Sequence, residues 1–321
     1  MNPRSVRLEV LHLCKRQVGI DLIRDVSFRE ERCGVVALTG PSRSGKSTVL
    51  LMIAGLVHRT TGLIEVQGRS IADPACRRFI GSAVGDPAPY YGLSVIDTLD
   101  LAGELRGMTR ASVRERLDYL DRALALPPLG SVVSKLPLTQ RRRVMLAASL
   151  VADPPVLVWD EPADLADEEE VRRIEQLLRN LAADHLVLLG TRSTQLAAHV
   201  ARRILVLDRG ALVYDGPNIE FGTLLPFRRI EVSFGQPVAP ERLAAVLPIA
   251  FQLTVVNDRV FRIRFLRNDP KGAQLLQFLL PIGRIVDFRD LPTDWTPPPP
   301  PSMERPTART PAVSDLARIR N

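Results

Sequence analysis

Short apolar runs alternate with stretches of helical spacing through most of the chain. The runs at residues 35–38, 155–159 and 186–190 are apolar at nearly every position, which is typical of strands buried on both faces. Residues 79–84 form a further short strand candidate. Helical spacing is found at Val49–Ala54, from Val95 to Leu126, and from about Gln140 to Leu150. This alternation predicts an α/β fold around a parallel sheet.

Antiparallel strands are predicted at both ends of this region. Val6–Leu13 and Ile23–Phe28 predict an opening antiparallel sheet, and Gly62–Gly68 predicts another strand and its turn. Residues 204–216 predict a hairpin that turns at Asp208-Arg209-Gly210. We therefore expect an antiparallel β subdomain beside the parallel core.

The pattern changes from about Arg228. The expected elements are strand Ile230–Phe234, helix Pro240–Leu247, strands Phe251–Val256 and Val260–Leu266, helix Lys271–Leu280 and strand Ile285–Phe288. This β-α-β-β-α-β order predicts a small α+β domain of the ferredoxin-like kind. Phe261, Ile263 and Phe265 alternate with Arg262, Arg264 and Arg267, so one sheet face packs and the other is basic. The basic face is either solvated or contacts a partner or lipid head groups.

A proline-rich tail closes the chain. Five prolines, Pro297–Pro301, begin a stretch rich in Pro, Thr and Arg that runs to Asn321 and is expected to be disordered. The predicted organisation is a large domain at 1–220, a ferredoxin-like domain at 228–290 and a disordered tail at 296–321.

The strongest motif is Gly40-Pro41-Ser42-Arg43-Ser44-Gly45-Lys46-Ser47-Thr48, a complete G-x-x-x-x-G-K-[ST] phosphate loop between a predicted strand and a predicted helix. Its glycines let consecutive backbone N–H groups point at one phosphate chain at the positive end of the helix. Lys46 would reach the β- and γ-phosphates, Ser47 would ligate Mg²⁺, and Thr48 would bond the phosphates. The alternative is a Gly/Ser-rich turn that binds nothing.

A second motif lies 120 residues downstream, where the apolar strand at 155–159 ends in Asp160 and Glu161. In phosphate-loop proteins a strand-terminal Asp holds the Mg²⁺ water shell, which predicts that role for Asp160. Glu161 would polarise the attacking water. An acidic pair can also simply end a strand or cap a helix.

Composition adds few constraints. The net charge of +7, from 43 Lys+Arg and 36 Asp+Glu, is mild over 321 residues and suits an anionic membrane face as well as dispersed solvated charge. Cys14, Cys33 and Cys76 show no metal-binding spacing, so reduced thiols in the cytosol are expected. Neither a signal core nor a membrane-spanning apolar run of about 18 residues is present.

The order and spacing of the two motifs resemble the ATP-binding cassette of ABC transporters, over Val6 to Gly216. The resemblance implies a P-loop NTPase fold with a helical subdomain at about 90–152, and ATP and Mg²⁺ as cofactors. Ala163–Asp167 resembles the loop that lines the contact between two cassettes. The C-terminal extension is similar to those of export cassettes that serve a separate membrane subunit.

In this family two cassettes pair head to tail with ATP between them. The resemblance therefore implies a homodimer or heterodimer with a second cassette, an integral membrane permease as partner, and a place on the inner face of the cell membrane in the cytoplasm. No nucleic-acid partner is expected.

Several positions depart from the family pattern. The signature Leu-Ser-Gly-Gly-Gln aligns with Leu136–Gln140, where Pro137 has neither hydroxyl nor N–H and Leu138 is bulky; Thr139 could restore one bond. Losing two or three charge-assisted bonds at about 1.5–3 kcal/mol each would weaken the paired state. Three further positions differ from the family pattern. Gly85 aligns with the family's Gln, which Asp86 could replace, and Arg192 aligns with its switch His. Gln17 aligns with the aromatic residue that stacks on adenine. His185 and His199 are expected to be surface residues.

We expect Mg·ATP binding with slow hydrolysis. The expected catalytic residues are Lys46 and Glu161, and the metal ligands are Ser47 and Asp160. The nucleotide-binding residues are Gly40, Pro41, Ser42, Arg43, Ser44, Gly45, Lys46, Ser47, Thr48 and Arg192. Two alternatives stay open: a catalytically degenerate cassette that regulates an intact one, and a soluble cassette that acts on ribosomes or DNA.

Overall fold

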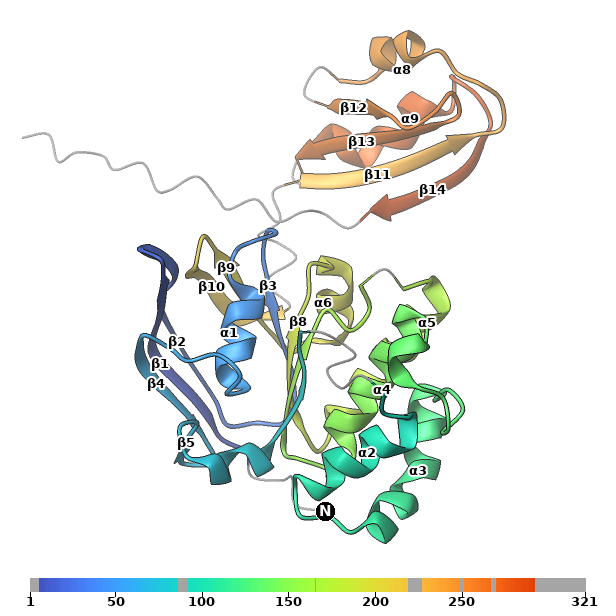
Figure 1. Cartoon of the computed structure of the whole chain (residues 1–321). Helices are drawn as coiled ribbons and strands as arrows, with labels where there is room; N and C mark the ends of the chain where they lie inside the picture. Colours follow the sequence, from blue (N-terminus) through green and yellow to red (C-terminus); the bar gives the residue numbers. More distant parts are fainter. Residues whose placement is uncertain are drawn as a thin grey trace, which may run out of the picture.

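The computed structural model describes residues 6–85, 92–164, 166–218, 227–248, 251–266 and 270–291, and these residues form three sheets (Figure 1). The largest sheet has the strand order β10-β9-β3-β8-β7-β6. Its strands are β3 (Gly34–Thr39), β6 (Ile80–Ala83), β7 (Val156–Asp160), β8 (Leu186–Gly190), β9 (Arg203–Asp208) and β10 (Ala211–Pro217). All neighbours are parallel except β9 and β10, which form the predicted hairpin.

The apolar runs form the centre of this sheet because both of its faces are covered. In β3, Val36 and Leu38 pack on the side of helix α1 (Lys46–Ile53), whereas Val35 and Ala37 pack on the opposite side. Every residue of β8 is buried. The carboxyl ends of parallel strands lie at one edge of the sheet, so the segments that follow β3, β7 and β8 are brought together there.

The second sheet is antiparallel, with the order β2-β1-β4-β5. It contains β1 (Leu8–Gln17), β2 (Ile20–Glu30), β4 (Thr61–Val66) and β5 (Arg69–Ser70). Helix α1 lies between this sheet and the six-stranded sheet, and their side chains share one apolar core (Figure 1). The hairpin β1–β2 extends past the predicted strands because polar residues such as Arg16 and Asp21 continue the ladder.

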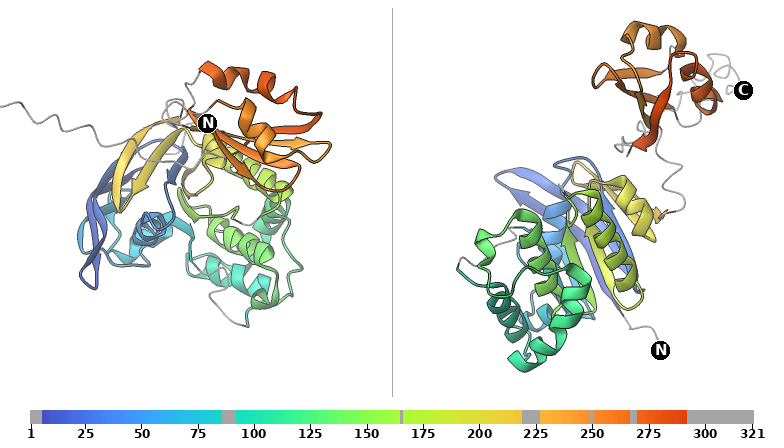
Figure 2. Two further views of the ribbon diagram at one scale, coloured as in Figure 1. Left: turned by 90° about the horizontal axis from the view of Figure 1, so that it is seen from above. Right: turned by 90° about the vertical axis from the view of Figure 1, so that its right-hand side faces the viewer.

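Helices cover the other face of the six-stranded sheet (Figure 2). They are α2 (Val95–Glu104), α3 (Arg110–Leu124), α4 (Leu138–Leu150), α5 (Glu168–Leu181) and α6 (Thr194–Val200), with a short 3-10 turn at Val133–Lys135. A second 3-10 turn, Pro74–Phe79, packs into the core on the side of α1. The predicted helical stretch from Val95 to Leu126 is two helices, because Gly107 takes a φ of 82° and Thr109 caps α3. Helices α5 and α6 were not predicted.

The C-terminal part has a four-stranded antiparallel sheet with the order β12-β13-β11-β14. Its elements are β11 (Phe227–Phe234), α8 (Pro240–Val246), β12 (Gln252–Val255), β13 (Val260–Leu266), a 3-10 turn (Pro270–Gln274), α9 (Leu275–Leu279) and β14 (Ile285–Leu291). Phe261, Ile263 and Phe265 are buried with both helices on one face, as predicted. On the opposite face Glu231 is bound by Arg262 at 2.8 Å and Arg289 at 2.6 Å.

The two histidines that were expected at the surface differ in burial. The prediction that His185 is a surface residue is wrong: it is 6% exposed, beneath the start of β8, and its Nε2 lies 3.4 Å from Asp153 Oδ1. His199 is exposed and pairs with Glu175. The expected disordered tail and Asp86 lie outside the described residues. Among those residues, no helix combines the length and apolar character needed to cross a bilayer.

Candidate functional site

The phosphate loop connects β3 to α1 through a backbone that needs glycine. Gly40 has a φ of 141°, and a Cβ there would lie 2.0 Å from the carbonyl oxygen of Leu207. Gly45 has a φ of 106° and precedes the first residue of α1. Between them Arg43 also has a positive φ, of 64°. The loop therefore curls tightly around the N-terminus of α1, where unpaired N–H groups and the helix dipole favour an anion.

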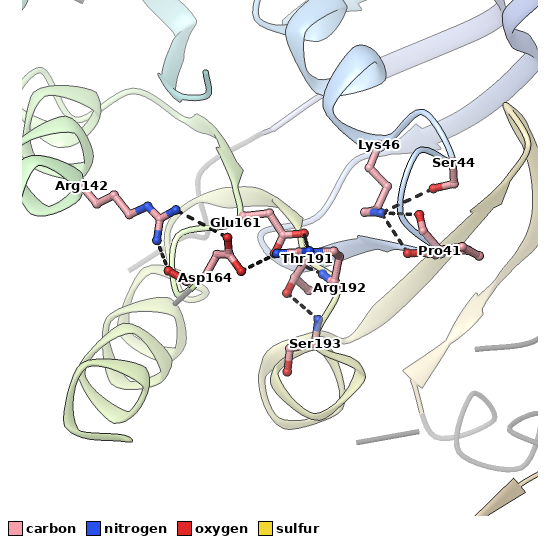
Figure 3. A network of polar contacts seen from close by, with 10 residues as sticks. Pro41, Ser44, Lys46, Arg142, Glu161, Asp164, Thr191, Arg192 and Ser193 are labelled. Atoms are coloured by element: carbon pink, nitrogen blue, oxygen red, sulfur yellow. Dashed lines mark hydrogen bonds and ion pairs between the residues drawn. The ribbon is translucent and has the colours of Figure 1, made fainter. Parts of the chain in front are cut away.

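Lys46 is folded back over this loop (Figure 3). Its Nζ donates to the carbonyl oxygens of Gly40 at 2.9 Å and Pro41 at 3.0 Å, and the residue is 6% exposed. Burial lowers the pKa of Lys46, while the charges of Glu161 and Asp160 act in the opposite direction. The ammonium group is thus held in a dry position by neutral carbonyls that an incoming phosphate could replace.

The turn between β9 and β10 supports the loop from behind. Gly210 donates its N–H to the carbonyl of Ser44 at 2.9 Å, and its own carbonyl accepts from Arg24 N at 2.7 Å. A Cβ on Gly210 would lie 2.3 Å from the carbonyl oxygen of Leu22. The hairpin turn was predicted from its sequence, whereas this contact joins residues more than 160 positions apart and has no local signal.

Asp160 is the last residue of β7, and its Oδ1 is buried without a hydrogen-bond partner among the described residues. A buried acceptor with no partner is costly unless a ligand completes it. Gly190 allows the carboxylate to sit there, because a Cβ at that position would lie 2.5 Å from Asp160 Oδ1. Carboxylate and hydroxyl oxygens are hard ligands, so Asp160 and the exposed Ser47 fit Mg²⁺.

Glu161 begins the turn after β7 with a φ of 48°. Its N–H donates to the carbonyl of Gly190 at 2.8 Å, which fixes the backbone. Its two carboxylate oxygens accept from the backbone N–H and from Nε of Arg192, each at 3.2 Å. Burial raises the pKa of Glu161, and the N–H and charge of Arg192 oppose that rise. A carboxylate in this setting can accept a proton.

Arg192 also binds a second acid (Figure 3). Its Nη2 donates to Asp164 Oδ1 at 2.5 Å. Arg142, on α4, donates to the backbone carbonyl of Asp164 and lies 3.7 Å from its Oδ2. The guanidinium of Arg192 was expected to contact a phosphate, and in this structure it faces two carboxylates. Neither Asp164 nor Arg142 was among the predicted site residues.

The predicted residues line two cavities. A cleft of about 590 Å³ is lined by Gly40, Pro41 and Ser42 together with Glu161 and Arg192. A smaller cavity of about 270 Å³ is lined by Leu22 and by residues 43–48 of the phosphate loop. The loop therefore separates the two spaces, with the carboxylate of Glu161 on the side of its first residues.

The positions that depart from the family pattern lie at or within two residues of the end of a helix or strand. Pro137 is the N-cap of α4 and offers no side-chain cap, so the hydroxyl nearest this helix start is that of Thr139. Gly85 has a φ of 82° and open space where a Cβ would be. Gln17 is exposed at the end of β1.

The chain is similar in sequence to known proteins. A family model described as ABC transporter matches residues 23–164. A sulfate/thiosulfate import ATP-binding protein of Synechococcus elongatus is 33% identical over 68% of this chain and 67% of its own. An Fe(3+) ions import ATP-binding protein of Rhizobium meliloti is 32% identical over 65% of this chain and 60% of its own.

A solved dimeric ATP-binding cassette, bound to ADP and Pi after hydrolysis, superposes with a TM-score of 0.61. It covers 66% of this chain and 98% of its own length at 23% identity, and this likeness concerns the fold. The phosphate loop, the acidic pair after β7 and the shared fold agree with the family match. The chain therefore belongs to the ATP-binding cassette family of ABC transporters.

Proposed function

We propose that this chain is the ATP-binding subunit of an ABC transporter complex, which binds Mg·ATP, hydrolyses it slowly and drives a separate membrane permease. The observation that carries the proposal is the convergence at one edge of the sheet. The curled loop after β3 lies there with Asp160, whose Oδ1 has no hydrogen-bond partner among the described residues, and with the half-buried carboxylate of Glu161. Cation, metal ligand and base are the groups that phosphoryl transfer to water requires.

Each residue then has a role in the proposal. The backbone N–H groups of residues 42–48 cradle the phosphates. Lys46 exchanges the carbonyls of Gly40 and Pro41 for the β- and γ-phosphates. Ser47 and Asp160 hold Mg²⁺, which neutralises the developing charge on the phosphates when it is bound. Glu161 takes the proton of the attacking water.

Slow hydrolysis follows from three departures. Pro137 supplies no hydroxyl to a partner's γ-phosphate, and Gly85 has no side chain to reach the metal or the water. Arg192 carries a permanent charge, so it cannot shuttle a proton as a histidine does. We expect turnover by the isolated chain below about 1 s⁻¹, the lower end of the range for ordinary enzymes.

The comparisons bear on the direction of transport. Both relatives named above are import proteins, so these similarities do not support the export role that the C-terminal extension suggested. The permease partner and the pairing with a second cassette are inferred from family membership. For the extension itself, the strand order β12-β13-β11-β14 and the β-α-β-β-α-β sequence support a ferredoxin-like domain.

Thermal unfolding with and without Mg·ATP tests the proposal. At a ligand concentration 100 times Kd, the stabilisation is about 2.7 kcal/mol, or a rise in Tm of roughly 5–11 °C for a domain of this size. We expect Lys46→Ala to abolish most of the rise, and Lys135→Ala, an exposed lysine outside the loop, to retain it. An equal rise in wild type and Lys46→Ala would refute nucleotide binding at this loop.

The regulatory alternative is favoured by the three departures themselves, because Pro137, Gly85 and Arg192 stand where the family has groups that complete the site. Glu161→Gln separates the two functions, because the amide keeps the shape and cannot act as a base. If this chain hydrolyses the ATP that drives transport, the variant eliminates transport in cells. If transport persists unchanged, the chain regulates another cassette.

A further inference from the structure

Four charged side chains of alternating sign run from helix α4 to the catalytic carboxylate. Arg142 lies 3.7 Å from Asp164 and also donates to its backbone carbonyl. Asp164 accepts from Arg192 Nη2 at 2.5 Å, and Arg192 Nε donates to Glu161 at 3.2 Å. The proposed function uses Glu161 but assigns no part to Asp164 or Arg142.

The backbone beneath Arg192 is as firmly held as its side chain. Thr191 donates its N–H to the carbonyl of Leu38 at 3.1 Å, which ties the segment to β3. Ser193 donates its N–H to Thr191 Oγ1 at 3.0 Å and caps helix α6 with its own hydroxyl. The backbone N–H of Arg192 is therefore aimed at the carboxylate of Glu161 by secondary structure.

The guanidinium geometry explains why two acids are needed. A guanidinium presents its N–H donors in a planar fork, so its orientation is set only when two edges are bound. Glu161 binds the Nε edge and Asp164 binds Nη2, while about half of the arginine side chain remains exposed at 48%. Without Asp164 the exposed end of the side chain would be free to sample other rotamers.

We propose that Arg192 is a positioning residue that holds the Glu161 carboxylate in place, and that Asp164, fixed by Arg142, holds Arg192. The inference rests on the proposed function, since it assigns Arg192 to the base of that same site. It differs from the expectation that Arg192 binds phosphate. A residue that binds the γ-phosphate would raise the affinity for ATP and not for ADP. A positioning residue instead affects turnover and leaves the affinity for both nucleotides unchanged.

The kinetic test uses Asp164→Asn, which keeps the shape and removes the charge. Because a small misplacement of a catalytic group can cost about a hundredfold, we expect kcat to fall about tenfold or more. Kd for ATP and for ADP, measured by titration, should each stay within about twofold. Arg192→Ala should match or exceed the loss, Arg192→Lys should restore only part of it, and the double variant should be no slower than Arg192→Ala.

Arg172→Ala is the matched control, because Arg172 pairs with Glu168 at 3.6 Å on the exposed side of α5 and is not one of the four charged residues described above. It should leave kcat unchanged. The inference is overturned if Asp164→Asn keeps wild-type turnover. It is also overturned if Arg192→Ala weakens ATP more than tenfold without weakening ADP, because Arg192 would then be a phosphate ligand.

A second measurement requires neither nucleotide nor turnover. The arginine Nε–H signals of the nucleotide-free protein can be recorded by NMR, with Arg192 assigned by loss of its signal in Arg192→Lys. In wild type and in Arg172→Ala we expect the chemical shift of the Arg192 Nε–H to differ from that of free arginine. In Asp164→Asn we expect it to match that of free arginine. An unmoved signal in Asp164→Asn would overturn the inference, whereas absent Mg·ATP stabilisation of wild type would overturn the proposed function alone.

Discussion

Gly190 offers the sharpest test of how the proposed metal site is built. It is the last residue of β8, and it lies between the carboxylate of Asp160 and helix α1. In Gly190→Ala the new Cβ would lie 2.5 Å from Asp160 Oδ1 and 2.5 Å from Leu50 Cδ1. Both distances are far below van der Waals contact, so one neighbour must move.

The magnitude follows from which neighbour yields. Adding a methyl group to a packed interior costs about 1–3 kcal/mol, which corresponds to a loss of roughly 2–12 °C in Tm for a domain of this size. Leu50 belongs to α1 and is fully buried, so it has little room. Displacement of the Asp160 carboxylate is the easier response, and it removes the proposed Mg²⁺ ligand from its position.

The assay is thermal unfolding in ATP with Mg²⁺ and in ATP with EDTA. We expect Gly190→Ala to lower Tm and to lose most of the difference between the two conditions. Gly130→Ala is the control, since a Cβ there meets no atom within 4 Å. If Gly190→Ala unfolds within about 1 °C of wild type and keeps the full Mg²⁺-dependent rise, the packing argument is refuted.

Three further predictions concern the scaffold, each measured by urea unfolding. Asp167 accepts from the third N–H of α5, so Asp167→Ala should cost about 0.5–2 kcal/mol, and an unchanged midpoint would contradict this cap. Ser149→Ala leaves the buried Trp159 Nε1, which now donates at 3.0 Å, without a partner and should cost about 1–3 kcal/mol; a neutral result would mean that another acceptor replaces it. Burial alone would raise the pKa of Glu30, but hydrogen bonds from Arg202 and from backbone N–H groups outweigh it and lower the pKa. Its stabilisation is therefore complete above the unfolded-state pKa of about 4.3 and is lost as pH falls through the folded-state pKa. Glu30→Gln should destabilise the protein at pH 7 and decline less in acid; parallel pH profiles would contradict this.

Local patterns predicted the strands that are buried on both faces. Such strands are apolar at nearly every position, so β3, β7 and β8 could be located from their apolar runs alone. Helix α5 was missed although its start carries a local signal, the capping Asp167 followed by three glutamates. The helical stretch after Val95 was read as continuous because its apolar spacing runs on, whereas Gly107 and Thr109 divide it.

The sequence by itself determined where the phosphate loop and the acidic pair lie, because their spacing follows a buried strand and the carboxyl ends of parallel strands meet at one edge. Only the tertiary structure decided what surrounds them. The contact of Gly190 with Asp160 and the binding of Arg192 by Asp164 join segments about thirty residues apart, and the burial of His185 depends on packing beneath β8. Side-chain periodicity reports the environment of single elements, and the distances between elements are set by packing, which no local pattern encodes.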